Sequence, residues 1–525
     1  MPGGGLLALV AYGSQNVLLS GNPEMTYFYK TFKKYTHFSL ETTSQLMDGV
    51  TDWPYDRTVQ LKSRIQRVGD IMTDIYFSFD LPAIYSKYQQ TNPIVGPTSQ
   101  QQFQWARYLG AAAIQSVYIT VGPNKIQEFT GEYLMARALI DFPKDKFEKW
   151  QVLVGDTPEF NDPANGLYGT KTATGGIYPT VYPYYTPQNQ LQQPQVNQPS
   201  IPATRIYVPL PFWFTEEGQG LPFVGLQYYT VDVTINLTPS QQLYTVLDAS
   251  GFRMAPGFRV SSPLASIQRN IPDFIPTITS DAFVQNFFTD IGYTVPALNS
   301  WPANPLIHTT YAFLPEKERN IFASKPLTYL VRQVTLVPFP EIISNAILDL
   351  EIHNPITRLI LVPRRSDSLL YRNAYANVTN WWNWPDRPKI PNNYFPDNQF
   401  IECEASSGAL VPASQLDIVQ ALRVLVDGNE IQELKLTPFF TDYTPYKYLS
   451  GGANRNIPVY SFELKSPGTQ PCGSLNSSRI RKFQLDLQVW PLPPNSSYIY
   501  SLNVHVENYN FFLVEAGMGD LKYAL

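Results

Sequence analysis

The feature that most constrains the fold of this chain is a fifteen-residue pattern that occurs twice. Residues 114–128 and 419–433 align without a gap at a constant offset of 305 positions. The identical pairs are Gln115/Gln420, Val121/Val426, Asn124/Asn429, Ile126/Ile431, Gln127/Gln432 and Glu128/Glu433. Strand propensity selects valines, and turns select asparagine, but neither selects the shared Ile-Gln-Glu. The repeat therefore predicts a duplicated β domain.

Each copy has the pattern of a β-hairpin. Its first half alternates apolar with other residues, which places one face of a strand in a core. The alternating residues are Val117, Ile119 and Val121 in the first copy and Leu422, Val424 and Val426 in the second. Turn residues follow at 122–124 and 427–429, and a return strand begins at Ile126 and Ile431.

The size and composition of the chain agree with two β domains. A length of 525 residues is too great for one ordinary core. Aromatic residues reach 14% and prolines number 46, whereas charged residues are only 15%. This mixture is typical of large antiparallel sheets joined by long, stiff loops.

The strands that follow each hairpin recur in the same order. An aromatic strand comes first, then a long alternating strand (229–237 and 483–489) and a closing strand (308–314 and 502–506). The first half is longer because it carries irregular insertions. We therefore predict an all-β fold of two consecutive eight-stranded antiparallel jelly rolls, a double jelly roll with long loop insertions and a few short helices.

The domain limits follow from this order. We expect an N-terminal arm at 1–25, a first jelly roll at 26–315 with insertions near 156–203 and 240–305, a linker at 316–324, and a second jelly roll at 325–525 with an insertion near 366–410.

Short helices are expected at 131–155, broken at Pro143. In the strand at 71–81, alternation places Ile71 towards the core and Met72 away from it.

No motif in the chain predicts catalysis, a cofactor or a metal. The four histidines are on separate expected strands, and none has a Cys, Asp or Glu at ligand spacing. Cys403 and Cys472 are too few for a disulfide framework, which favours a reducing compartment. Paired carboxylates across a groove have no characteristic spacing, so a carbohydrate-binding or glycoside-hydrolysing β-sandwich protein remains the alternative.

Charge and modification signals are weak. A net charge of −5 without a basic arm gives no reason to expect direct nucleic-acid binding. Four Asn-x-Ser/Thr triplets are candidate glycan acceptors, at Asn236, Asn377, Asn476 and Asn495. We treat them as unmodified by default, because the N-terminus does not resemble a signal peptide.

The N-terminal arm contains a short apolar run. It comprises Leu6, Leu7, Leu9 and Val10 with Ala8, is too short to span a bilayer, and has no Lys or Arg before it. An apolar segment exposed on a soluble particle invites aggregation, so we expect these residues to be an assembly contact. The alternative is that they fold back under their own jelly roll.

Several motifs along the whole chain resemble those of one protein family. They are the N-terminal Gly-Gly-Gly-Leu-Leu-Ala-Leu-Val with Leu19-Ser-Gly-Asn-Pro, Arg67-Val-Gly-Asp, Gly131-Glu-Tyr-Leu, Leu210-Pro-Phe-Trp-Phe, Leu221-Pro-Phe-Val-Gly-Leu-Gln-Tyr, Val459-Tyr-Ser-Phe-Glu-Leu, Pro471-Cys-Gly-Ser-Leu-Asn-Ser-Ser-Arg-Ile, Asn508-Tyr-Asn and Gly517-Met-Gly. In this order they resemble the major capsid proteins of nucleocytoplasmic large DNA viruses. Ser477 and Arg481 depart from the usual pattern, which has an aromatic residue and Asp there.

The resemblance implies a structural role. It implies homotrimers that form pseudo-hexagonal capsomers of a large icosahedral double-stranded DNA virus, in contact with neighbouring capsomers and with minor capsid proteins beneath the shell. An inner membrane would lie nearby, and the protein would be made and assembled in the host cytoplasm. The acidic chain without a basic arm agrees with a shell that is separated from its DNA.

Overall fold

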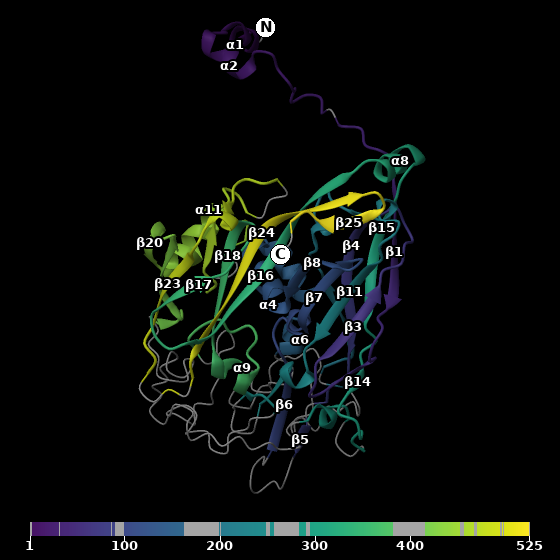
Figure 1. Ribbon diagram of the computed structural model, residues 1–525, viewed down its shortest axis with the longest axis vertical. Helices are drawn as coiled ribbons and strands as arrows, with labels where there is room; N and C mark the ends of the chain where they lie inside the picture. The colour runs from purple at the N-terminus through teal and green to yellow at the C-terminus, as the bar shows by residue number, and fades with distance from the viewer. Residues whose placement is uncertain are drawn as a thin grey trace.

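The fold consists of two β-sandwiches side by side, with a short N-terminal segment that extends away from them (Figure 1). The computed structural model describes residues 3–30, 32–85, 87–89, 99–161, 199, 201–247, 253–256, 283–289, 294–381, 415–451, 456–466, 470–493, 496 and 498–523. Most of the insertion near 156–203 and parts of those near 240–305 and 366–410 lie outside these residues.

The first sandwich has the strand order of a jelly roll. One sheet has the order β1-β15-β4, with β9 and β10 both paired to β4, and the facing sheet has the order β3-β11-β7-β8. Its strands are β1 (Ser39–Leu46), β3 (Val59–Arg64), β4 (Ile71–Leu81), β7 (Ile114–Val121), β8 (Asn124–Thr130), β9 (Thr204–Pro209), β10 (Leu221–Pro222), β11 (Val231–Leu237) and β15 (Leu306–Phe313).

The second sandwich repeats this order strand for strand. One sheet has the order β16-β24-β18, with β21 and β22 paired to β18, and the other has the order β17-β23-β19-β20. Its strands are β16 (Leu327–Ile342), β17 (Ala346–Leu350), β18 (Pro355–Arg365), β19 (Val419–Val426), β20 (Asn429–Leu436), β21 (Val459–Ser461), β22 (Leu475–Asn476), β23 (Phe483–Val489) and β24 (Tyr500–Glu515). The predicted all-β double jelly roll is confirmed.

The two repeated hairpins occupy equivalent places, as the sequence predicted. Val121 pairs with Asn124 across the first turn, and Val426 pairs with Asn429 across the second. Gly122 has a φ of 59°, and Gly428 has a φ of 82° beside Asp427. Two-residue turns with positive φ match the twist of antiparallel strands, which explains why both copies carry glycine here.

Short helices and small sheets fill the connections. The helices of the body are α3 (Leu109–Ala112), α4 (Gly131–Asp141), α5 (Lys144–Leu153), α6 (Pro158–Asn161), α8 (Glu316–Ser324), α9 (Ser366–Arg372) and α11 (Thr444–Tyr448). The predicted break falls at Pro143, which precedes α5. Helix α8 lies between the last strand of the first sandwich and the first strand of the second, where the sequence predicted a charged link.

The insertion predicted as irregular near 240–305 contains regular structure. It holds β12 (Tyr244–Leu247), β13 (Arg253–Met254) and β14 (Trp301–Pro302). Together with β5 (Lys87–Gln89) and β6 (Ser99–Trp105), strands β12 and β13 form a separate four-stranded sheet. Its partners come from a distant connection, so no local period in the sequence revealed it.

One facing prediction in β4 is wrong. Met72 was expected to point away from the core, but it is fully buried. The pairing of β4 with β15 shifts by one residue between Thr310 and Tyr311. Because a bulge adds a residue to one strand, it breaks the two-residue alternation, and both Ile71 and Met72 become buried.

Among the described residues, none of the helices combines the length and the apolar character that crossing a membrane requires.

Candidate functional site

The most extensively built polar site lies where the two sandwiches meet. The sheet that contains β18 and β24 has one face in the core of the second sandwich, and its other face packs on the first sandwich. Leu359 and Leu361 of β18 belong to the second core, whereas Ile360 and Val362 belong to the cluster of the first sandwich. Strand β18 is therefore buried on both faces, which fixes the two sandwiches to each other.

The first hairpin contributes directly to this junction. Gln127 on β8 donates from Nε2 to the carbonyl oxygen of Arg332 on β16, at 2.8 Å. In return, Gln333 donates from Nε2 to the carbonyl oxygen of Ile126, at 2.6 Å. The side-chain oxygen of Gln127 also accepts from the backbone N–H of Trp213, at 3.1 Å. Ile126 and Gln127, which are identical in the two copies of the repeat, thus hold the sandwiches together in the first copy.

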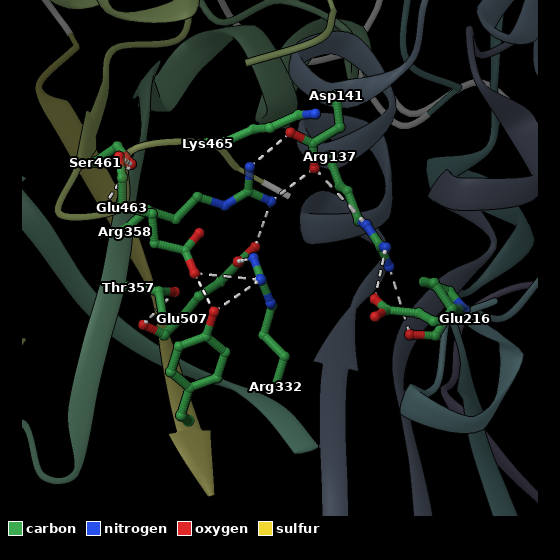
Figure 2. Close-up of polar contacts among 12 residues, drawn as sticks. Arg137, Asp141, Glu216, Arg332, Thr357, Arg358, Ser461, Glu463, Lys465 and Glu507 are labelled. Carbon is green, nitrogen blue, oxygen red and sulfur yellow. Dashed lines mark hydrogen bonds and ion pairs between the residues drawn. The ribbon is translucent and has the colours of Figure 1, made fainter. Parts of the chain in front are cut away.

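A buried ionic network crosses the junction (Figure 2). Arg358 of β18 forms a bidentate pair with Asp141 at the end of α4, with Nη1–Oδ1 at 2.6 Å and Nη2–Oδ2 at 2.7 Å. Its Nη2 also donates to Glu507 of β24, at 2.6 Å. Arg358 is fully buried, so this charge depends on protein partners in place of water.

The same network extends through Glu507 to further groups. The hydroxyl of Tyr133, on α4, donates to Oε1 of Glu507 at 2.7 Å, and Nη1 of Arg332 donates to Oε2 at 3.2 Å. Nη2 of Arg332 lies 3.4 Å from Glu463, which also accepts from the hydroxyl of Tyr509. Figure 2 shows Arg332, Arg358, Glu463 and Glu507 of the second sandwich close to Asp141 of α4 in the first.

The arginines set the charge of Glu507. Burial alone would raise the pKa of this carboxyl group, but the positive charges of Arg358 and Arg332 outweigh it and lower the pKa from 4.5 to about 2. Burial raises the pKa of Tyr133, and the negative charge of Glu507 raises it further. Glu507 is therefore ionised throughout the physiological range, and Tyr133 remains a neutral hydrogen-bond donor.

A second polar cluster joins the start of α4 to the second sandwich. Glu132 accepts from Nε of Arg364 at 2.7 Å and from Nδ2 of Asn503 at 2.6 Å. Nε2 of His505 lies 3.1 Å from the same carboxylate. Burial would raise the pKa of Glu132, but Arg364 and His505 lower it to about 2. Helix α4 is thus anchored by carboxylates at both of its ends.

The backbones also approach closely at this junction. Gly451 donates from its N–H to the carbonyl oxygen of Ile140 at 3.1 Å, and Ser450 donates from Oγ to that of Asp141 at 2.6 Å. A Cβ atom at Gly451 would lie 2.2 Å from the Ile140 oxygen. Only glycine permits this approach of the two segments.

The site holds the two sandwiches together through paired charges, and we refer to these pairs as the ionic clamp. In the clamp, the carboxylates of Asp141, Glu132, Glu463 and Glu507 are each paired with an arginine. Within the part of the chain that the structure describes, no cluster of three or more His, Cys, Asp or Glu has a metal-binding arrangement. The arrangement supports a fixed orientation of the two sandwiches.

The predicted assembly residues lie far from this site. Leu6, Leu7, Leu9 and Val10 are on α1 (Gly4–Val10), which is followed by α2 (Ser14–Ser20) in a segment that projects from the body (Figure 1). Their exposed fractions are 72–80%. In this single chain they do not fold back under the first jelly roll, and their role as an assembly contact stays a prediction.

The four candidate glycan acceptors differ in their surroundings. Asn377 is fully buried, and its side chain donates to the carbonyl oxygen of Trp381 and accepts from Thr379, so its amide is not available to a glycan in this fold. Asn236 donates to Ser116 on the neighbouring strand, and Asn476 is exposed at the edge strand β22. Asn495 lies outside the described residues.

The ionic clamp was not predicted from the sequence. A signal was present in residues 355–365, Pro-Ile-Thr-Arg-Leu-Ile-Leu-Val-Pro-Arg-Arg, where apolar residues are continuous rather than alternating. Continuous apolar runs indicate a strand buried on both faces. An arginine inside such a strand must then find a buried carboxylate.

Comparison with known families matches both halves of the chain. The family described as "Major capsid protein N-terminus" matches residues 26–270, and that described as "Large eukaryotic DNA virus major capsid protein" matches residues 318–520. Similar proteins include the major capsid protein of Phaeocystis pouchetii virus, 22% identical over 583 aligned positions that cover 99% of both chains. Another is the major capsid protein of Paramecium bursaria Chlorella virus 1, 23% identical over 546 positions with the same coverage.

Solved structures show the same fold. The Faustovirus major capsid protein has a TM-score of 0.63 at 14% identity, covering 97% of this chain and 96% of its own. The quasi-atomic model of the PBCV-1 virus capsid also gives 0.63, at 18% identity, covering 95% of this chain and 100% of its own. With the two family matches and the matching strand order, the chain belongs to the major capsid proteins of nucleocytoplasmic large DNA viruses.

Proposed function

We propose that the chain assembles as a homotrimer that forms a pseudo-hexagonal capsomer of a large icosahedral DNA virus. The observation that carries this proposal is the pair of sandwiches with the same strand order, fixed side by side in one chain. Three such chains place six similar sandwiches around one threefold axis. A threefold object can then occupy a hexagonal lattice through closed symmetric contacts.

The ionic clamp supports the mechanical part of this role. A capsomer fits a regular shell only if the angle between its sandwiches is constant. The junction between the two sandwiches of one chain must therefore prevent their rotation. Arg358 binds carboxylates from both sandwiches at once, Asp141 from the first and Glu507 from the second. Breaking a buried pair leaves an uncompensated charge, which makes alternative orientations costly.

The division of the chain into an arm at 1–25, a jelly roll at 26–315, a linker at 316–324 and a jelly roll at 325–525 belongs to this proposal. The proposed location is the virion, with synthesis and assembly in the host cytoplasm.

The N-terminal arm is proposed to act at the inner side of the shell. Its exposed apolar residues, including Leu6 and Leu9, need a partner in the assembled particle. We infer that they dock on minor capsid proteins or neighbouring capsomers near the inner membrane. No contact with nucleic acid and no enzymatic activity are part of this role, in agreement with the capsid proteins whose sequences match.

The mass of the purified protein in solution tests the trimer. Light scattering is expected to give about three times the 59.5 kDa of one chain at micromolar concentration, because permanent interfaces of more than roughly 2,000 Å² remain closed at that dilution. A monomer as the main species would contradict the proposal. The alternative, a carbohydrate-binding or glycoside-hydrolysing sandwich, predicts a monomer or dimer.

A further inference from the structure

The connection between α2 and β1 is rich in exposed aromatic residues. Residues 25–38 read Met-Thr-Tyr-Phe-Tyr-Lys-Thr-Phe-Lys-Lys-Tyr-Thr-His-Phe and end directly before β1. The aromatic side chains, exposed by between 46% and 98%, are Tyr27, Phe28, Tyr29, Phe32, Tyr35 and Phe38. Within the described residues, neither hydrophobic core contains any residue of this segment. Aromatic surface of this extent on a soluble subunit marks a site of interaction.

The same segment is basic, although the chain is acidic. Lys30, Lys33 and Lys34 lie among the aromatic residues, and residues 25–38 contain neither Asp nor Glu. The whole chain has a net charge of −5. The partner of this segment is therefore expected to combine negative charge with an apolar layer.

The spacing of the side chains is that of an amphipathic helix. At 3.6 residues per turn, positions 25, 28, 29, 32 and 35 fall on one face. These positions hold Met25, Phe28, Tyr29, Phe32 and Tyr35. The three lysines and His37 fall on the opposite face. A helix formed by this segment would thus separate an aromatic face from a basic face.

In the single chain the segment has not formed this helix. None of its described residues lies in a helix or a strand, and the segment runs as an extended connection from β1 to α2 (Figure 1). Isolated helices shorter than about 12–15 residues are marginal in water. The aromatic face has no cover here that could stabilise a helix, so folding depends on binding.

Two features favour a lipid surface over a groove in a protein. A helix in a protein groove uses one apolar stripe, whereas Tyr27 and Phe38 lie outside the aromatic face, on the side of the lysines. The headgroup region of a bilayer accommodates aromatic rings and lysines together. A helix over residues 25–38 is also only about 21 Å long, which is too short to cross a bilayer and suits a position in its surface.

We propose that residues 25–38 bind the surface of an anionic lipid bilayer and fold there into an amphipathic helix parallel to the membrane. Phe28 and Phe32 enter the boundary between headgroups and acyl chains, while Lys30, Lys33 and Lys34 contact the anionic headgroups. This inference rests on the proposed function, which places the arm at the inner side of the shell. It adds a direct contact with lipid, made by a segment separate from the apolar run of α1.

Vesicle flotation with the purified full-length protein tests this contact. Vesicles of phosphatidylcholine mixed with phosphatidylserine are expected to bind the protein, and vesicles of phosphatidylcholine alone are expected to bind it at least about tenfold more weakly. Added salt is expected to release the protein, because it screens the lysines from the lipid.

A triple substitution assigns the binding to this segment. Lys30→Gln with Lys33→Gln and Lys34→Gln is expected to weaken binding to the phosphatidylserine vesicles by at least about tenfold, since each lysine near an anionic surface contributes about fivefold. The matched control removes three exposed lysines of α5 and is expected to bind as the parent does. Its substitutions are Lys144→Gln, Lys146→Gln and Lys149→Gln. Light scattering verifies that both variants keep the mass of the parent.

Fluorescent labels test the helix itself. Single cysteines are introduced as Phe28→Cys, Phe32→Cys or Lys33→Cys, in a chain that also carries Cys403→Ser and Cys472→Ser. An environment-sensitive fluorophore at position 28 or 32 is expected to shift its emission to shorter wavelength when vesicles bind, and one at position 33 is expected to remain unshifted. Equal shifts at all three positions would contradict the amphipathic helix.

The lipid contact and the trimer fail in different experiments. A trimer that ignores phosphatidylserine vesicles would overturn the inference, assign the segment to a protein partner and leave the proposed capsomer standing. A trimer that binds these vesicles equally well without Lys30, Lys33 and Lys34 would also overturn it. A monomeric parent protein would contradict the proposed trimer, whatever its affinity for vesicles.

Discussion

Ile126 and Ile431 occupy the same position in two copies of one hairpin, yet Ile126 is fully buried and Ile431 is 42% exposed. Their backbones have the same place in the two sandwiches, so the difference comes from what lies outside each hairpin. A second sandwich covers the first copy, and nothing within the described residues covers Ile431 to the same extent. The repeated sequence therefore specifies the hairpin, whereas the burial of each copy depends on whether a neighbouring sandwich lies against it.

The first prediction concerns the ionic clamp. Asp141→Asn removes the charge that Arg358 binds through two of its three short contacts, and it is expected to lower the free energy of unfolding by about 3–5 kcal/mol. Asp349→Asn, in the exposed pair with Lys482, is expected to cost less than about 1 kcal/mol. Chemical denaturation of both variants measures the difference. Equal effects would show that the clamp does not contribute to stability.

The second prediction concerns acid stability. The pKa values of Glu507 and Glu132 fall from 4.5 to about 2 on folding, so the folded state favours their ionised forms. Each carboxylate contributes about 3 kcal/mol, which is fully present above pH 4.5 and is lost as the pH falls towards 2. Unfolding curves between pH 6 and pH 2 are expected to show this loss.

A charge-removing variant assigns that pH dependence to one residue. Glu507→Gln is expected to be less stable at pH 7 and to lose less further stability between about pH 4.5 and pH 2, because it has no proton to gain there. Glu217→Gln, at an exposed site, is the control and should keep the parent's pH profile. An unchanged slope in Glu507→Gln would contradict the assignment.

The third prediction concerns the approach of the two backbones at Gly451. Gly451→Ala places a methyl group 2.2 Å from the Ile140 carbonyl oxygen, so the segments must separate. The expected cost is about 1–3 kcal/mol of unfolding free energy. Gly5→Ala, where a Cβ atom meets nothing within 4 Å, should leave the melting temperature unchanged. A Gly451→Ala protein as stable as the parent would show that this contact opens without cost.

The fourth prediction concerns the N-terminal arm. Removal of residues 1–20 deletes α1 and α2, none of whose residues is buried in the single chain. Trimers of normal thermal stability are therefore expected, and these trimers should fail to build shells. Differential scanning calorimetry and electron microscopy of assembly reactions measure the two outcomes. If the deletion unfolds the trimer, the segment belongs to its core.

The parts of the fold that could be predicted from the sequence are those with local signals. Alternating residues and turn glycines identified the hairpins at Val121/Asn124 and Val426/Asn429, and the repeat predicted their equivalence. The burial of Met72 could not be predicted, because a bulge opposite Thr310 and Tyr311 depends on pairing with a strand more than 200 residues away. Local alternation does not contain that information.

The candidate site was predictable to a smaller extent. Arg358 and Glu507 lie opposite each other in one sheet, and their burial depends on α4 of the first sandwich packing on that sheet, a contact without a sequence period. The exposed run with Leu6 and Val10 was visible as an unpartnered apolar segment. In contrast, the burial of Asn377 was hidden, since its triplet reads like any surface acceptor.

The most direct test of the central claim is the structure of the assembled trimer at side-chain resolution, determined by electron cryomicroscopy. Three chains are expected around a threefold axis, with their six sandwiches arranged as a pseudo-hexagon. Particles of one chain, or trimers whose six sandwiches do not form a pseudo-hexagon, would contradict the proposed function.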